Sequence, residues 1–284
     1  AVSLPNARTK ALAMAAAVAD GRDPAAERAR QRGELTFGAF AETYLERHAT
    51  PRKRSAGEDQ RMLRDVLRPN AGDEKRGPSP IPSTWKNRRL SDITRAEVAQ
   101  LHARLQRDRG LYTANRVLAL LRTMFNLAER WGTFHAENPV AGIRMFREEK
   151  RDRFLNPDEL KRTLAAIDEE SDWRWKACFK LSLLLGPRRS ELLSARWVDI
   201  DLQTFTWRLP TTKAGRSHLL PLPTAAVAIL ESLPSRAQSE WLFPSNTAAS
   251  AHLEEPKKAW QRMRSQADVK DVRIHDLRRT LGSW

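Results

Sequence analysis

Five apolar residues near the middle of the chain constrain its fold more than any other feature. They recur at the i, i+4, i+7, i+8 and i+11 spacing of one buried α-helical face: Val117, Leu121, Met124, Phe125 and Ala128. The basic residues of the same stretch fall outside this face: Arg116, Arg122 and Arg130. A helix with such a face buries it against other helices, so the pattern predicts a helical bundle.

Further helical patterns precede this one, and no convincing strand separates them. The predicted helices have apolar positions or charged residues at helical spacing: Asn6–Val18, a charged helix to Arg32, Phe37–Leu45 and Glu58–Leu67. Thr36 can cap the third of these helices, and Thr94-Arg-Ala-Glu97 forms a capping box that starts another. Residues 69–89 are rich in Pro, Gly, Ser and charge, which predicts a surface loop or insertion.

The second half of the chain begins with two predicted helices. Asn156 can cap the first helix, with Pro157 at the first helical position. Three apolar residues are expected on its buried side: Leu160, Leu164 and Ile167. The second helix runs from about Trp173 to Leu185 and ends at Gly186-Pro187.

A β-hairpin is predicted after these helices. The first strand alternates apolar and polar residues: Phe205, Trp207 and Leu209 are apolar. The second strand is expected at Ser217–Leu222, and helices are expected again from Thr224 onward, including Glu254–Ala267 and one that starts near His275. The predicted fold class is therefore mainly α with a small β-sheet.

Length and charge place limits on what the chain can do. Its 284 residues exceed one ordinary compact core, and the charged stretch Arg147–Arg153 predicts a linker near residue 150. The 50 Lys and Arg exceed the 35 Asp and Glu, giving a net charge of +15, with the larger surplus in the first 150 residues. This balance favours a polyanionic partner, although a well-solvated basic surface also explains it.

Cysteine content and hydropathy bear on the compartment. Cys178 is the single cysteine and lies in an apolar helical stretch, so neither a disulfide framework nor a cysteine-based metal site is expected. No apolar run approaches the roughly 20 residues of a membrane span. We therefore expect a cytoplasmic protein with no membrane contact.

Three clusters of polar residues stand in order in the second half. They are Gly186-Pro-Arg188-Arg-Ser-Glu191, Lys213 at the hairpin turn, and His275-Asp-Leu-Arg278. Each has an ordinary structural explanation: a solvated arginine, a surface lysine or a packed histidine. Arginine also suits phosphate chemistry, because its fixed cationic fork donates two parallel hydrogen bonds to phosphate oxygens.

Together the clusters resemble the catalytic-domain boxes of the tyrosine recombinases. The context agrees, with Trp197-Val-Asp-Ile after the first box and Pro221-Leu-Pro after the hairpin. Thr113-Ala-Asn-Arg116 and Asn138-Pro-Val-Ala-Gly142 resemble the helical core-binding domain of phage integrases. Residues 1–32 resemble the end of the arm-binding domain and linker helix of island integrases.

The resemblance implies three parts and a fold for each. Residues 1–32 would be the arm-binding remnant, 33–148 a helical core-type DNA-binding domain, and 149–284 an α+β catalytic domain. It implies site-specific DNA recombination, the integration or excision of a prophage or genomic island, by phosphotyrosine strand exchange. No cofactor or metal is implied.

The resemblance also assigns roles to residues of this chain. Arg188, His275 and Arg278 would bind the scissile phosphate, Lys213 would be the general acid, and Glu191 would support Arg188. DNA contacts are expected from six further residues: Arg95, Thr113, Asn115, Arg116, Arg122 and Arg216. Arg189 and Arg279 are expected to pack or to contact the DNA backbone, since the motif does not require them.

One departure from the family pattern concerns the nucleophile. A tyrosine, and before it a further His or Trp, is expected well beyond the His275–Arg278 box, but the chain has two tyrosines, Tyr44 and Tyr112, both in the first half. There a core or surface aromatic is the expected role. We interpret the 284 residues as truncated at both ends, able to bind DNA but inactive.

Two other functions share parts of this pattern. A type IB topoisomerase uses the same chemistry on one duplex, but the residues resembling an arm-binding domain and the Asn138–Gly142 segment favour an integrase. A regulatory DNA-binding protein descended from an integrase is the non-enzymatic alternative, and the retained basic residues of the boxes argue against it. The intact enzyme is expected to act on double-stranded attachment sites in the bacterial nucleoid as a homotetramer, with a possible directionality factor.

Overall fold

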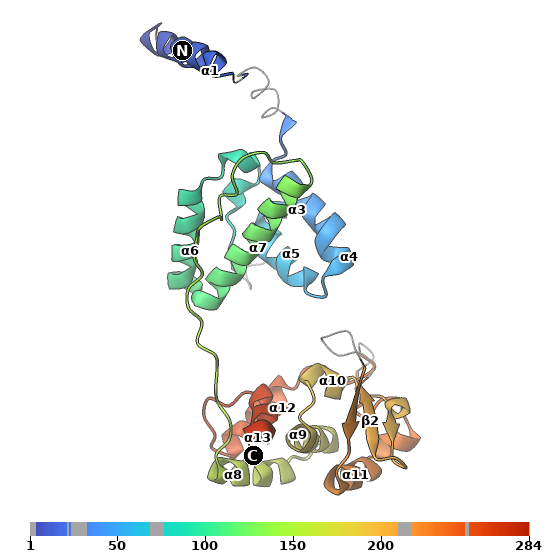
Figure 1. The fold of residues 1–284 in the computed structure, drawn as a ribbon. Helices are drawn as coiled ribbons and strands as arrows, with labels where there is room; N and C mark the ends of the chain where they lie inside the picture. Colours follow the sequence, from blue (N-terminus) through green and yellow to red (C-terminus); the bar gives the residue numbers. More distant parts are fainter. Residues whose placement is uncertain are drawn as a thin grey trace. The chain divides into compact units, whose positions relative to one another are not determined.

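The computed structural model describes residues 4–21, 23, 33–68, 77–209, 217–247 and 250–283. The chain divides into two compact units, residues 1–149 and 150–284, which are described separately (Figure 1). Helix α1, Leu4–Ala19, confirms the helix expected at Asn6–Val18. The charged helix expected to end at Arg32 lies outside the described residues.

The rest of the first unit is a small helical bundle. Its elements are α3 (Phe37–Tyr44), a π-helical turn (Leu45–Ala49), α4 (Thr50–Arg52), α5 (Ala56–Leu67), α6 (Arg95–Arg109), α7 (Leu111–Arg130) and two 3₁₀ turns at Ser83–Trp85 and Leu90–Asp92. The expected caps are present, because the side chain of Thr36 accepts from the Ala39 amide and Thr94 forms a capping box with Glu97. All five apolar residues that predicted the α7 face are buried.

The segment expected to be a surface loop contributes to the core instead. In its described part, residues 77–89, Ile81 and Trp85 are buried. The Trp85 ring meets the Phe37 ring edge to face, with centroids 5.5 Å apart. The described part is a loop with a short 3₁₀ turn, as expected, but its placement at the surface was wrong for these two side chains, because Pro, Gly and Ser mark turns but do not show where isolated apolar side chains point.

The second unit contains six α-helices among its described residues. They are α8 (Pro157–Asp168), α9 (Trp173–Leu185), α10 (Arg189–Leu193), α11 (Thr224–Glu231), α12 (Lys257–Gln266) and α13 (Ile274–Ser283), with 3₁₀ turns at Trp197–Asp199 and Pro234–Ala237. Asn156 caps α8 as expected, in a capping box with Glu159. Leu164 is 39% exposed, so its expected burial was wrong, and Thr163 and Ala166 occupy the inner face with Ile167.

A three-stranded antiparallel sheet completes the second unit. Its strands are β1 (Ile200–Asp201), β2 (Thr206–Leu209) and β3 (His218–Pro221), in the order β1-β2-β3. Trp207 and Leu209 point into the core, as the alternation predicted. Phe205 does not, because it lies in the turn before β2 with a φ of 53° and an exposed ring.

Two smaller observations concern the core and the surface. Burial raises the pKa of the Cys178 thiol to about 12, so this side chain packs as a neutral group. Of the helices that the structure describes, none is long and apolar enough to cross a bilayer. The helices and strands given above make the protein mainly helical, with a small sheet in the second unit.

Replacing Trp85 by alanine tests whether the segment before α6 is part of the core. We expect the free energy of unfolding to fall by about 3–5 kcal/mol, because the variant loses a buried aromatic and leaves a cavity. Urea unfolding followed by circular dichroism measures this change. Ser83→Ala, an exposed position of the same 3₁₀ turn, should change it by less than about 0.5 kcal/mol. Equal effects would show that Trp85 is not packed as described.

Candidate active site

Arg188 stands at the start of α10, just after the turn that ends α9. Its backbone amide donates to Glu191 Oε2 at 2.7 Å, and its Nη1 donates to Glu191 Oε1 at 2.6 Å. The Glu191 side chain is 11% exposed, whereas that of Arg188 is 39% exposed. One carboxylate therefore holds both the backbone and the guanidinium of Arg188, while the arginine still reaches solvent.

Gly186 provides the close approach that brings a second arginine to this turn. It has a φ of +59°, which an L side chain rarely adopts, and ends α9 in the left-handed conformation. A Cβ there would lie 2.8 Å from Leu281 Cδ2 and 3.5 Å from Arg278 Cγ, both on α13. The guanidinium of Arg278 donates to the Gly186 carbonyl. Two motifs far apart in the sequence thus meet at one turn.

A cavity of about 400 Å³ opens at this turn. Its lining comes from the α9–α10 turn, the hairpin and α13: Leu185, Gly186, Pro187, Arg188, Glu191, Leu209, Ser217, His218, Leu220 and Arg278. Two arginines therefore line one cavity, and a pair of arginines suits an anion with several oxygens. His275 is not among the residues that line it.

His275 lies in the first turn of α13 and is exposed. Partial burial of the ring and the positive charges of Arg279, Arg278 and Arg188 lower its pKa, while the Asp276 carboxylate acts in the opposite direction. The imidazole is therefore mainly neutral at pH 7. A neutral ring can donate a hydrogen bond without adding further charge to a site that already holds arginines.

Lys213 and Arg216 lie outside the described residues. The strands before and after them are described, and both contribute to the cavity through Leu209 and His218, which face each other in the register of β2 and β3. The role of Lys213 stays a prediction.

Two of the residues expected to contact DNA from the first unit form hydrogen bonds within that unit. Asn115 is 4% exposed, and its amide group bonds His102, the backbone of Phe146 and the Glu148 carboxylate. Arg122 is half-buried and donates to the Ile143 carbonyl at 2.8 Å. Both side chains hold the segment after α7 against the bundle and are bonded within the first unit.

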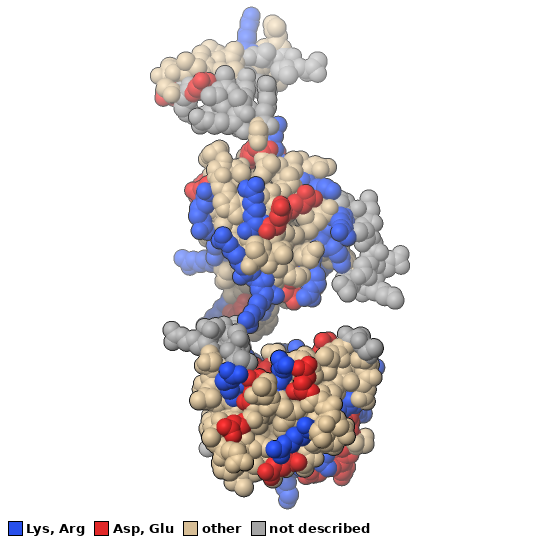
Figure 2. All heavy atoms as spheres, turned by 90° about the vertical axis from the view of Figure 1, so that its right-hand side faces the viewer, with Lys and Arg blue, Asp and Glu red and all other residues tan. Residues whose placement is uncertain are grey.

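Other basic side chains of the first unit are open to solvent. Helices α6 and α7 carry six exposed arginines: Arg95, Arg104, Arg107, Arg109, Arg116 and Arg130. Two of them, Arg95 and Arg116, are predicted DNA contacts. Thr113, a third predicted contact, is half-buried. Figure 2 shows Lys and Arg side chains over one face of this unit. Arg95 also forms an ion pair with Glu137.

Both tyrosines of the chain lie in the first unit. Tyr44 is buried and donates to Asp59 Oδ2 at 2.6 Å, and burial followed by this carboxylate raises the pKa of Tyr44 well above its usual value. Tyr112 is exposed and donates to the Glu149 carbonyl at 2.9 Å. Neither belongs to the unit that carries the arginine cavity.

Sequence reasoning missed two residues of this region. His218 lines the cavity, and its signal was a lone polar, ionisable residue at the start of a predicted strand. Asp276 lies between His275 and Arg278 in the motif and is almost fully buried. Helical spacing turns it roughly 100° away from His275 and further still from Arg278, and this periodicity could have indicated that it faces the core.

Comparison with known proteins identifies the family. Residues 153–284 match the family model for the phage integrases. The chain belongs through this domain to the phage integrase family, the tyrosine recombinases.

Two curated relatives illustrate the extent of the likeness. The shufflon-specific DNA recombinase of Escherichia coli is 30% identical over 201 residues, which cover 67% of this chain and 50% of the relative. The integrase of Salmonella phage P22 is 26% identical over 180 residues, covering 59% of this chain and 45% of the relative. The matched part is thus half or less of the length of these relatives.

Solved structures share the fold. A lambda integrase tetramer bound to a Holliday junction aligns with a TM-score of 0.71 at 18% identity, covering 99% of this chain and 82% of that one. The Tn1549 transposon integrase in complex with circular intermediate DNA aligns with a TM-score of 0.67 at 11% identity, covering 87% of this chain and 86% of that one. At these identities the likeness is one of fold.

The lowered pKa of His275 can be measured by following its ring signals by NMR. We expect a value below the ordinary 6.5, and Arg279→Gln should raise it because it removes a nearby positive charge. Since the folded-state pKa is depressed, the unfolded chain binds more protons, and stability should fall as the pH drops below 6.5. Arg273→Gln is the control, since this exposed arginine is not among the charges acting on His275. A pKa at or above 6.5 would contradict the description.

Proposed function

We propose that this protein takes part in site-specific DNA recombination, the integration or excision of a prophage or other mobile genetic element, by phosphotyrosine strand exchange. The observation that carries this proposal is the single cavity shared by Arg188 and Arg278, with Glu191 holding Arg188 in place. Its substrate would be double-stranded attachment sites in bacterial DNA.

The proposed chemistry needs stabilisation of charge on a phosphate. When a tyrosine oxygen attacks the scissile phosphorus, negative charge builds on the non-bridging oxygens while the bond to the 5′ oxygen breaks. Arg188 and Arg278 would hold those oxygens, and His275, as a neutral donor, would add a contact. Lys213 would give its proton to the departing 5′ oxygen. Glu191 would keep Arg188 aimed at the phosphate.

DNA binding would depend strongly on the first unit. Its exposed arginines on α6 and α7, Arg95 and Arg116 among them, would contact phosphates, and Thr113 would contribute a hydroxyl. Arg216 would add a contact from the second unit. Because a lambda integrase structure is a tetramer on a Holliday junction, we propose a homotetramer on DNA for the intact enzyme, with a possible directionality factor.

Salt dependence tests the proposed DNA contacts. Affinity for duplex DNA, measured by fluorescence anisotropy, should fall by about 10³-fold or more between about 50 and 200 mM salt if six or more phosphates are contacted. Arg116→Gln should reduce the slope of log K against log salt by about one contact. Arg122→Gln should leave the slope unchanged, since its guanidinium is used inside the unit. A flat salt response would remove the basis for a phosphate-binding surface.

The general acid is tested with a substrate whose 5′ bridging oxygen is replaced by sulfur, in a longer form of the chain that carries a C-terminal tyrosine segment. Sulfur leaves with little need for protonation, so this substrate should restore cleavage by Lys213→Ala. It should not restore Arg188→Lys or Arg278→Lys, which lose the two-pronged contact while still binding DNA. With the ordinary substrate, whose 5′ bridging atom is oxygen, each substitution should slow cleavage by about 10²-fold or more.

The 284-residue chain is the baseline of the same assay. We expect it to bind the substrate without forming a covalent adduct, because Tyr44 and Tyr112 lie outside the unit with the arginine cavity. Sulfur rescue of all three variants, or of none, would show that Lys213 is not the general acid. A covalent adduct on Tyr44 or Tyr112 would overturn the assignment of the site.

A further inference from the structure

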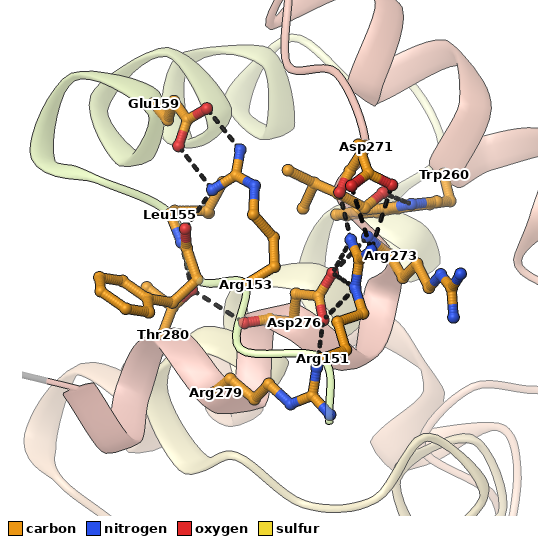
Figure 3. A network of polar contacts seen from close by, with 12 residues as sticks. Arg151, Arg153, Leu155, Glu159, Trp260, Asp271, Arg273, Asp276, Arg279 and Thr280 are labelled. Carbon is orange, nitrogen blue, oxygen red and sulfur yellow. Dashed lines mark hydrogen bonds and ion pairs between the residues drawn. The ribbon is translucent and has the colours of Figure 1, made fainter. Parts of the chain in front are cut away.

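Arg151, in the extended segment before α8, reaches the helix that carries His275 and Arg278 (Figure 3). Its Nη2 lies 2.9 Å and its Nε 3.1 Å from Asp276 Oδ2. Its Nη1 lies 3.1 Å from Asp271 Oδ2, and its Nη2 also donates to the Asp271 carbonyl. One guanidinium thus joins two carboxylates that flank the start of α13.

Asp276 is buried, and its carboxylate accepts several hydrogen bonds. It is 1% exposed, accepts from the Arg273 amide at 2.8 Å and from Arg279 Nη1 at 3.1 Å, and accepts from Arg151 as described. Burial acts to raise the pKa of Asp276, but the hydrogen bonds from Arg151 and Arg273 outweigh it, and the pKa stands below its usual value. The carboxylate is therefore ionised and depends on these donors.

Helix geometry connects this buried charge to the site. Asp276 and Thr280 lie one turn apart on the buried face of α13, whereas His275 and Arg278 are exposed. Thr280 Oγ1 accepts from the Leu155 amide at 3.0 Å and donates to the Asp276 carbonyl at 2.9 Å. The segment 151–155 therefore holds the buried face at two points.

We propose that Arg151 is a positioning residue, which fixes the rotation of α13 about its axis and so the direction in which His275 and Arg278 point toward a phosphate. This inference rests on the proposed function. Arginine suits the role because its fork can reach Asp276 and Asp271 together, which the single ammonium of lysine cannot do with the same geometry. Without Arg151, Arg279 and the Arg273 amide are the described donors left to Asp276.

Arg153 provides a matched control on the same extended segment. It forms a two-pronged ion pair with Glu159, at 2.9 and 2.5 Å, and its side chain is slightly more exposed than that of Arg151. Glu159 belongs to the capping box of α8, so this pair stabilises a different helix. Removing Arg153 takes away the same charge and an ion pair with one carboxylate, and none of its hydrogen bonds goes to α13, although its charge also acts on Asp276 from a distance.

Inorganic phosphate is the probe, and the His275 ring signal in NMR is the readout. The apparent Kd for phosphate is measured at that ring in the 284-residue chain and in the variants Arg151→Ala, Arg151→Lys and Arg153→Ala. Thermal unfolding of each variant gives its stability. We expect Arg151→Ala to weaken phosphate binding about tenfold and Arg151→Lys to weaken it less. Arg153→Ala should leave the Kd unchanged, although it should lower the thermal stability about as much as Arg151→Ala does.

Equal Kd changes in Arg151→Ala and Arg153→Ala, or full retention of affinity by Arg151→Lys, would overturn the positioning role. Arg278→Gln separates this outcome from failure of the proposed function. If phosphate perturbs His275 and Arg278→Gln abolishes the response while Arg151→Ala does not weaken it, the phosphate site stands and the positioning role falls. If phosphate does not perturb His275 in the unsubstituted chain, the proposed function is contradicted and the positioning role falls with it.

Discussion

The close approach of α13 to the turn at Gly186 is the contact on which the second unit's site depends. A left-handed glycine ends α9 there, and its missing side chain leaves room for Leu281 and Arg278. Because Arg278 then donates to the Gly186 carbonyl, the two motif arginines face one cavity. Neither the α9–α10 turn nor α13 alone could provide that cavity, since each supplies one arginine and part of the wall.

Buried carboxylates hold the basic residues of this unit in a consistent way. Glu191 is largely buried and holds Arg188, which still reaches solvent. Asp276 is buried and holds Arg151, on the face of α13 opposite His275 and Arg278. A buried, ionised carboxylate is stable only while its hydrogen-bond donors are present. Acidic residues are fewer than basic ones in this chain, and in these two places a buried carboxylate orients an arginine.

Part of the candidate site was predictable because its signals are local. The Arg188–Glu191 contact follows from a three-residue spacing at a helix start, where a carboxylate can reach the backbone amide. The burial of Asn115 was not predictable, because its partners Phe146 and Glu148 come from a segment more than thirty residues later. Its side chain looks like a DNA contact in sequence but serves as an internal bridge.

The sequence by itself determined the helices whose signals lie within a few residues, such as α9, which ends where Gly186-Pro187 predicted, and α8, which Asn156 caps as expected. The mixture of helices and one hairpin was determined in the same way. Only the tertiary structure decided that Trp85 is buried, that Leu164 is exposed and that Arg151 reaches Asp276, 125 residues away. Periodicity reports which side of a helix is apolar, but which side chains meet depends on how distant segments pack, and no local pattern encodes that.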